Sequence, residues 1–314
     1  MERLKMKAEI QQFNIQHPTG DDLQRVIQFM IDCDIAEFGE ADTDADDVAD
    51  QWEETDLSTD VWIASDTEGQ LIGYALLSIE MNNRRYIDLY THQGRSPKGL
   101  ADVLIEQMVE RFNTHVSSGS STADCLLTAY ANGLNKINCS AYDAHGFEIE
   151  KFHYRMQMDF EAEQPAPEWP QGVALSAFTE ADERPLFDLI IETFDWMGVP
   201  PFTFDVWQKQ MFRGGRFDPE LFIMLKKDGV LSGAALCYNE EFRLWLKELA
   251  ISKRLQGTGL GTKLLKQVFY EAQKRAVPTV ALGVVSQNPK AYAFYEHAGM
   301  TRTREFVQYK RPAG

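Results

Sequence analysis

Residues 256–262, Gln256-Gly257-Thr258-Gly259-Leu260-Gly261-Thr262, join a strand pattern to a helix pattern. Backbone N–H groups in the first turn of a helix have no partner within the helix, and they carry the positive end of its dipole. Such groups bind anions, and glycines let a diphosphate approach the backbone closely. The stretch therefore predicts an anion cradle at the start of a helix.

Two common nucleotide sites do not fit this stretch. A P-loop needs Gly-Lys-Ser/Thr, but Lys263 follows Thr262. A dinucleotide fingerprint needs Gly or Ala at position 262 and an acidic residue closing the next strand, and residues 282–286 contain none. A glycine-rich turn without a ligand is the weaker alternative, because three alternating glycines destabilise a helix start unless the space is used.

Hydrophobic periodicity predicts an α/β fold, with a mostly antiparallel mixed sheet flanked by helices. In the second half the order is β-α-α-β-β-β-α-β-α-β. The expected strands are 173–178, 221–225, 230–237, 242–251, 279–285 and 301–309, and the expected helices begin at Thr179 and cover 203–212, 260–275 and 289–297.

The first half repeats the second, at a constant offset that changes only at the loop 117–121. We therefore expect two tandem domains, 8–160 and 172–314, joined by a stiff linker, 161–171, that contains three prolines. The pairs 160 residues apart are Gly73 and Gly233, Asp88 and Glu248, and Gly99 and Gly259; those 153 apart are Asn135 and Asn288, Tyr142 and Tyr295, and Gly146 and Gly299.

Two motifs in the second half resemble those of the GNAT acyl-CoA N-acyltransferases. One is Gln256-x-x-Gly259-x-Gly261, and the other is the run from Asn288 to Met300, in which Asn and Tyr precede a Gly-hydrophobe pair. The resemblance covers residues 172–314 and, more weakly, 8–160. A pair of such domains resembles the tandem-GNAT group, which includes mycothiol synthase.

The resemblance implies acetyl-CoA as co-substrate and assigns roles to individual residues. Glu248 stands at the position of the base and Tyr295 at that of the acid, although Glu248 is alternatively an exposed strand carboxylate and Tyr295 a packed aromatic. A backbone N–H near Ile251 would stabilise the thioester oxygen. The residues implied to bind coenzyme A are Leu249, Ala250, Ile251, Gln256, Gly257, Thr258, Gly259, Leu260, Gly261, Thr262 and Asn288.

The first half departs from this pattern at its cradle, Ser96-Pro97-Lys98-Gly99-Leu100-Ala101. Pro97 has no N–H to donate, and Ser96 replaces the expected Gln or Arg. Asp88, Asn135 and Tyr142 nevertheless stand where Glu248, Asn288 and Tyr295 stand. We hypothesise a weakened or non-catalytic domain with a degenerate cradle.

A net charge of −17 argues against nucleic-acid binding. Residues 26–83 contain sixteen Asp and Glu but no Lys or Arg, which indicates either a solvated surface or a field that attracts a cationic substrate. Trp196 beside Asp195 lies between two expected helices, where an aromatic next to an acid holds a cation or packs in the core.

Cysteine and histidine spacing predicts no disulfide framework and no metal site. Residues 1–9 lack an apolar signal core, and no apolar stretch is long enough to span a bilayer. We therefore expect a cytoplasmic protein without a membrane partner, either a monomer or a homodimer.

The leading hypothesis is an acetyl-CoA-dependent N-acetyltransferase. It would move an acetyl group to a primary amine of a small cationic acceptor, by direct attack in a ternary complex. The alternatives are a non-catalytic acyl-CoA sensor and a protein N-terminal or lysine acetyltransferase. Mycothiol synthesis rests on architecture alone, which does not fix a substrate.

Overall fold

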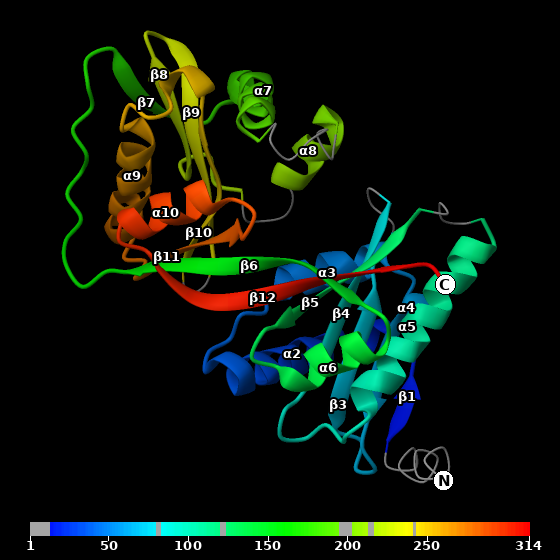
Figure 1. Ribbon diagram of the computed structural model, residues 1–314. Helices are drawn as coiled ribbons and strands as arrows, with labels where there is room; N and C mark the ends of the chain where they lie inside the picture. Colours follow the sequence, from blue (N-terminus) through cyan, green and yellow to red (C-terminus); the bar gives the residue numbers. More distant parts are fainter. Residues whose placement is uncertain (1–12, 80–82, 120–123, 195–202, 213–216, 241–242) are drawn as a thin grey trace. The chain divides into compact units, whose positions relative to one another are not determined.

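The computed structural model describes residues 13–79, 83–119, 124–194, 203–212, 217–240 and 243–314 (Figure 1). The chain forms two compact units. Unit 1 comprises residues 1–152 together with 305–314, and unit 2 comprises residues 153–304. Each unit is a mixed sheet with helices, which confirms the predicted α/β class.

The sheet of unit 2 has the strand order β6-β11-β10-β9-β8-β7. Apolar residues of α9 and α10 pack with one face, and those of α7 and α8 pack with the other. The turn between β8 and β9 has positive φ at Asp228 and Gly229, as a two-residue hairpin turn requires. The elements are β7 (Val173–Ala177), α7 (Glu183–Thr193), α8 (Phe204–Met211), β8 (Phe222–Lys227), β9 (Val230–Asn239), β10 (Leu244–Ile251), α9 (Leu260–Lys274), β11 (Thr279–Val285) and α10 (Pro289–His297).

Unit 1 repeats this arrangement with the strand order β1-β2-β3-β4-β5-β12. Helix α5 packs on one face of the sheet and α2 with α3 on the other. The elements are β1 (Asn14–Gln16), α2 (Leu23–Phe38), α3 (Ala45–Glu54), α4 (Leu57–Asp60), β2 (Val61–Ser65), β3 (Leu71–Leu77), β4 (Arg84–Thr91), α5 (Leu100–Ser117), β5 (Leu126–Asn132) and α6 (Lys136–Ala144).

The last strand of each sequence repeat belongs largely to the other unit. Residues 153–159 of β6 (Glu148–Asp159) pair with β11, and residues 306–312 of β12 (Thr301–Pro312) pair with β5. The observed division therefore differs from the sequence boundaries 8–160 and 172–314. Duplicated edge strands offer equivalent hydrogen-bonding groups, so each fits the other sheet and periodicity cannot tell which sheet it joins.

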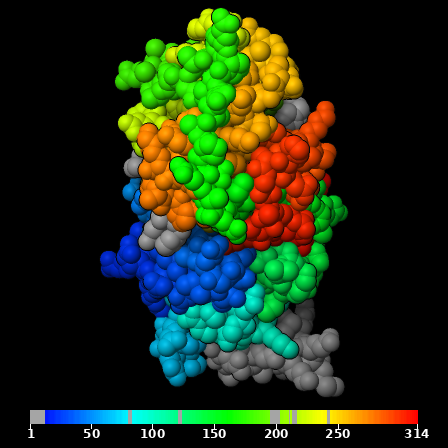
Figure 2. All heavy atoms as spheres, turned by 90° about the vertical axis from the view of Figure 1, so that its left-hand side faces the viewer, coloured from blue at the N-terminus to red at the C-terminus, as the bar shows by residue number. Residues whose placement is uncertain are grey.

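The linker 161–171 contains no helix or strand, and it lies within unit 2. It passes from β6 at one edge of that sheet to β7 at the other. Gln273 and Lys263 of α9 donate hydrogen bonds to the backbone carbonyls of Ala162 and Glu168. In Figure 2 the green segment that contains the linker lies over the orange surface. The linker is thus held against α9 along its length.

Two helices of unit 1, α3 and α4, were not expected from the sequence. The acidic run that suggested a solvated surface contains the start of α3, where the Asp44 carboxylate accepts from the N–H groups of Asp46 and Asp47. Val48 and Trp52 are the only apolar residues of α3 that are buried, too few for a clear periodicity. No helix in the described part of the chain is both long and apolar enough to cross a membrane.

Tyr309 tests the strand exchange. It comes from β12 but is 2% exposed in the core of unit 1. Tyr309→Ala should lower the free energy of unfolding of unit 1 by about 3–5 kcal/mol, because it leaves a large cavity there. Hydrogen exchange followed by mass spectrometry should show lost protection in β5 and α5. Lys310→Ala on the same strand is the control, and unchanged protection in unit 1 of the Tyr309 variant would contradict the exchange.

Candidate active site

The parallel strands β10 and β11 of unit 2 separate after a short stretch of pairing. Strand β11 pairs with β10 only at Leu244 and Trp245. From Leu246 to Ile251, β10 pairs with β9 on one side but with no described strand on the other. Every second backbone N–H and C=O of a strand points to the same side, so this edge presents unpaired groups. The result is a slot between β10 and β11, with Leu249, Ala250 and Ile251 on its edge.

A β-bulge at Lys247 sets which side chains face which way. Leu246 pairs with Cys237 and Glu248 with Leu236, so β10 advances two residues where β9 advances one. As a result Glu248 shares a sheet face with Trp245, whereas Leu246 faces the α9 side. The structure thereby turns Glu248 away from the α9 core.

The Glu248 carboxyl is half-buried, and burial raises its pKa to about 7. The Tyr295 side chain of α10 lies close enough for the charge of Glu248 to raise the pKa of its hydroxyl, in addition to the larger effect of burial. At neutral pH the phenol is therefore protonated, while the carboxyl is near its midpoint. A carboxyl and a phenol whose pKa values are both raised by burial thus lie in the same part of unit 2.

The predicted cradle lies at the end of β10 and the start of α9. Gly257 and Gly259 have φ of 77° and 83°, and a Cβ added at either would meet no atom within 4 Å. The first backbone bond of α9 runs from Lys263 N–H to the carbonyl of Gly259. The N–H groups of residues 259–262 are thus without a partner in the described chain. Open space and free donors suit a diphosphate.

Basic side chains flank the cradle in an otherwise acidic protein. Lys253 and Arg254 lie in the short 3₁₀ turn just before it, and Lys263 lies in the first turn of α9. Gln256 does not point to the cradle, because its amide donates to the carbonyl of Ile251 at 3.1 Å. Gln256 ties the loop to the end of β10.

Asn288 begins α10, where its side-chain oxygen accepts from the N–H of Ala291 at 3.1 Å. No contact occupies its amide nitrogen in the described structure, so that group is free to donate to a ligand in the slot. No residue of α10 is fully buried. Its residues Ala291, Tyr292, Phe294 and Tyr295 are partly buried and pack against the core of unit 2.

The cradle of unit 1 keeps an open glycine, Gly99 with φ of 86°, but it lacks free donors at positions 97 and 100. Pro97 has no N–H, and its carbonyl accepts from Leu100 N–H at 3.2 Å, which removes a further donor. The Ser96 hydroxyl is held by the carbonyl of Ile72 and by His92 N–H. Arg95, the nearest arginine, is paired with Asp32 at 2.8 Å. One donor of this cradle and the charge of Arg95 are thus used within the protein.

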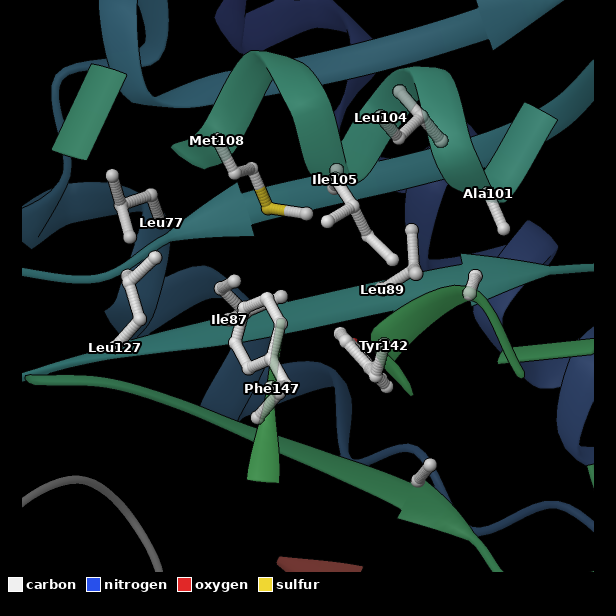
Figure 3. Close-up of a cluster of buried hydrophobic side chains, with 14 of the residues drawn as sticks. Leu77, Ile87, Leu89, Ala101, Leu104, Ile105, Met108, Leu127, Tyr142 and Phe147 are labelled. Carbon is white, nitrogen blue, oxygen red and sulfur yellow. The ribbon is translucent and has the colours of Figure 1, made fainter. Parts of the chain in front are cut away.

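The slot of unit 1 is partly filled by side chains. Asn138, at the position of Ala291, accepts from the Thr91 hydroxyl at 2.9 Å and contacts the carbonyl of Leu89, both on β4. Tyr142, at the position of Tyr295, is fully buried against Phe147 and Tyr309. Figure 3 shows Tyr142 beside Leu89 in the cluster beneath α5. Protein side chains take the place that is open in unit 2.

Two of the sequence predictions concern residues outside the described part of the chain, namely Asp195 and Trp196. Sequence analysis gave no role to Trp245, which shares the face of Glu248 and lies 5.3 Å from Arg155 and 5.9 Å from Arg243, measured from ring centroid to guanidinium carbon. In a regular strand, residues three apart lie on opposite faces. The sequence therefore does not show that Trp245 and Glu248 share a face unless the bulge is known. Within the described ranges there is no group of three or more residues that could hold a metal ion.

Comparison with known proteins identifies the family. Residues 183–300, which lie entirely in unit 2, match the model of the acetyltransferase (GNAT) family. Unit 2 thus contains a domain of the GNAT acetyltransferase family. Membership implies acetyl-CoA as the acetyl donor and confirms the resemblance found in the sequence.

The tandem architecture of this GNAT protein also has counterparts. Mycothiol acetyltransferase of Stackebrandtia nassauensis is 24% identical over 263 residues, covering 78% of this chain and 80% of its own. A GCN5-related N-acetyltransferase of Sphaerobacter thermophilus matches with a TM-score of 0.80 at 24% identity, covering 95% of both chains. A tandem GNAT protein from the clavulanic acid biosynthesis pathway matches with a TM-score of 0.71 at 14% identity, covering 96% of this chain and 99% of its own. These structures show a shared fold over both units.

The cradle can be tested with Gly259. Gly259→Glu should abolish coenzyme A binding measured by calorimetry, because a carboxylate would then face the diphosphate. Gly259→Ala is the matched control, since it carries the same backbone strain at φ of 83° without the charge. Binding of equal strength in both variants would mean that the cradle does not hold the diphosphate.

Proposed function

We propose that unit 2 transfers the acetyl group of acetyl-CoA to a primary amine of a small, cationic acceptor, by direct attack in a ternary complex. One observation carries this proposal. The open slot of unit 2 ends at a carboxyl with a pKa of about 7 and a protonated phenol, directly beside a cradle with free N–H groups. Unit 1 has the same elements, but its slot is partly filled and its cradle lacks free donors at positions 97 and 100.

Glu248 is the proposed base. An alkylammonium has a pKa near 10, so the attacking amine must lose a proton before it forms the new C–N bond. A carboxyl whose pKa is about 7 accepts that proton better than an ordinary glutamate, and it is ionised at slightly alkaline pH. Glu248 takes the proton directly or through one water.

The edge of β10 is proposed to stabilise the thioester. Its unpaired N–H groups from Leu246 to Ile251 face the slot, and one near Ile251 would donate to the oxygen that gains charge during attack. Tyr295 would donate its phenolic proton to the departing sulfur. Its raised pKa keeps that proton in place until the thiolate forms.

The same elements would hold the cofactor. The cradle 256–262 would bind the diphosphate, with Lys253 and Lys263 adding positive charge. The free amide nitrogen of Asn288 and the backbone of Leu249 and Ile251 would bind the pantetheine arm as if it were another strand. Acetyl-CoA supplies the activated acetyl group.

The acceptor is assigned by class only. A net charge of −17 favours a cation, and the curated relatives are mycothiol acetyltransferases. A small amine therefore suits both observations better than a protein substrate does. We also propose that unit 1 does not bind coenzyme A, because Asn138 and Tyr142 occupy its slot.

The proposed base predicts a pH profile. Below pH 7 Glu248 is protonated and cannot accept a proton, so kcat/KM for acetyl transfer should fall as pH decreases through about 7. Glu248→Gln should lower kcat/KM at pH 8 by about 100-fold or more and flatten that limb. Tyr295→Phe is the comparison variant: it should lower kcat but keep the limb. A limb that persists in Glu248→Gln would exclude Glu248 as the base.

The filled slot of unit 1 predicts a reciprocal pair of variants. Ala291→Asn gives unit 2 the side-chain amide that unit 1 has at Asn138. It should weaken coenzyme A binding on the order of tenfold, because the amide offers the β10 edge a partner within the protein. Asn138→Ala should leave binding unchanged, because the cradle of unit 1 still lacks donors. Calorimetry would measure both, and an unaffected Ala291→Asn variant would refute the proposed slot.

A further inference from the structure

Unit 1 retains a cavity on the side of β4 that carries Asp88, the counterpart of Glu248. Its volume is about 150 Å³, and all of its lining residues belong to unit 1. Four of these residues are acidic, and none is Lys, Arg or His. The acids are Asp34, Glu37, Asp42 and Asp88.

The carboxyls of Asp34 and Asp88 are only partly satisfied by the protein. Asp34 is 5% exposed and accepts three hydrogen bonds from Asp42 and Thr43, all at Oδ2. Its Oδ1 has no donor in the described structure. Asp88 likewise accepts only from Gln51, at Oδ2. The free Oδ1 of Asp34, in a buried residue that lines the cavity, calls for a ligand that donates a hydrogen bond.

Burial raises the pKa values of Asp34, Glu37 and Asp88. Three carboxyls at one cavity are thus held in an environment that lacks a compensating cation. The rings of Tyr90 and Tyr130 complete the wall, and aromatic faces attract cations. The charge of the cavity excludes an acyl-CoA diphosphate.

We propose that this cavity binds a small organic ammonium, such as a short alkyl diamine, which unit 1 holds without acetylating it. A cavity of this size takes a ligand of about six non-hydrogen atoms. An ammonium group donates three hydrogen bonds, which suits the free oxygens of Asp34 and Asp88. A metal ion suits the site less well, since the described acids do not converge as a ligand set. Unit 1 has thus lost the cofactor half of a GNAT site and kept the amine half.

The test uses the full chain without acetyl-CoA, and 1,4-diaminobutane as the probe in calorimetry. Wild type should bind it, and Asp88→Asn should weaken binding by about tenfold or more, because the amide removes the charge but can still accept from Gln51. Asp34→Asn should have the same effect. Asp21→Asn, an exposed acid of the same unit, is the matched control and should bind like wild type.

Two further measurements separate the proposal from its rivals. Glu248→Gln should bind the probe like wild type. If Glu248→Gln lost binding while Asp88→Asn kept it, the amine would be bound in unit 2 and the proposal would be overturned. The probe should raise the melting temperature of wild type but not of Asp88→Asn, which also shows that the variant folds. Equal displacement of the probe by magnesium chloride at the same ionic strength would overturn an organic ammonium. None of these outcomes depends on acetyl transfer in unit 2.

Discussion

The separation of β10 from β11 is the constraint on which the site of unit 2 depends. Backbone groups at a strand edge must be hydrogen-bonded to something, and after Trp245 no described strand provides partners on that side. The bulge at Lys247 turns Glu248 to the open face at this point. Glycines at 257 and 259 leave the helix start uncovered. The slot, the position of the Glu248 carboxyl and the open cradle thus follow from one interruption in the hydrogen bonding between β10 and β11.

Unit 1 satisfies the corresponding strand edge with its own side chains. Its β4 and β5 pair from Arg84 to Ile87, and beyond that point Asn138 and Tyr142 occupy the space between strand and helix. A slot filled by side chains is stable without a ligand, whereas an open one is complete only when a ligand pairs with its edge. The two units are therefore one fold with two ways of satisfying a strand edge, and this difference assigns different roles to them.

Each unit also depends on a strand from the other sequence repeat. The core of unit 1 contains Val307 and Tyr309 from the end of the chain, and β11 of unit 2 is covered by residues 153–159 from the first repeat. Unit 1 is built from two separate segments, and unit 2 begins with strand residues of the first repeat. The linker, which the sequence suggests as a spacer between domains, serves instead to carry the chain across the sheet of unit 2.

By itself the sequence determined the α/β class, the duplication, the cradle and the motif around Asn288 and Tyr295, because each depends on local periodicity or on a short run of residues. It also showed the defect at Pro97, because a missing N–H is a property of one residue. The parting of β10 and β11, the bulge, the raised pKa of Glu248 and the filled slot of unit 1 depend on which strands meet. The strand exchange does so too, since similar repeats make either pairing compatible with the sequence pattern. Contacts between residues far apart in the chain decided these features, and only the tertiary structure contains them.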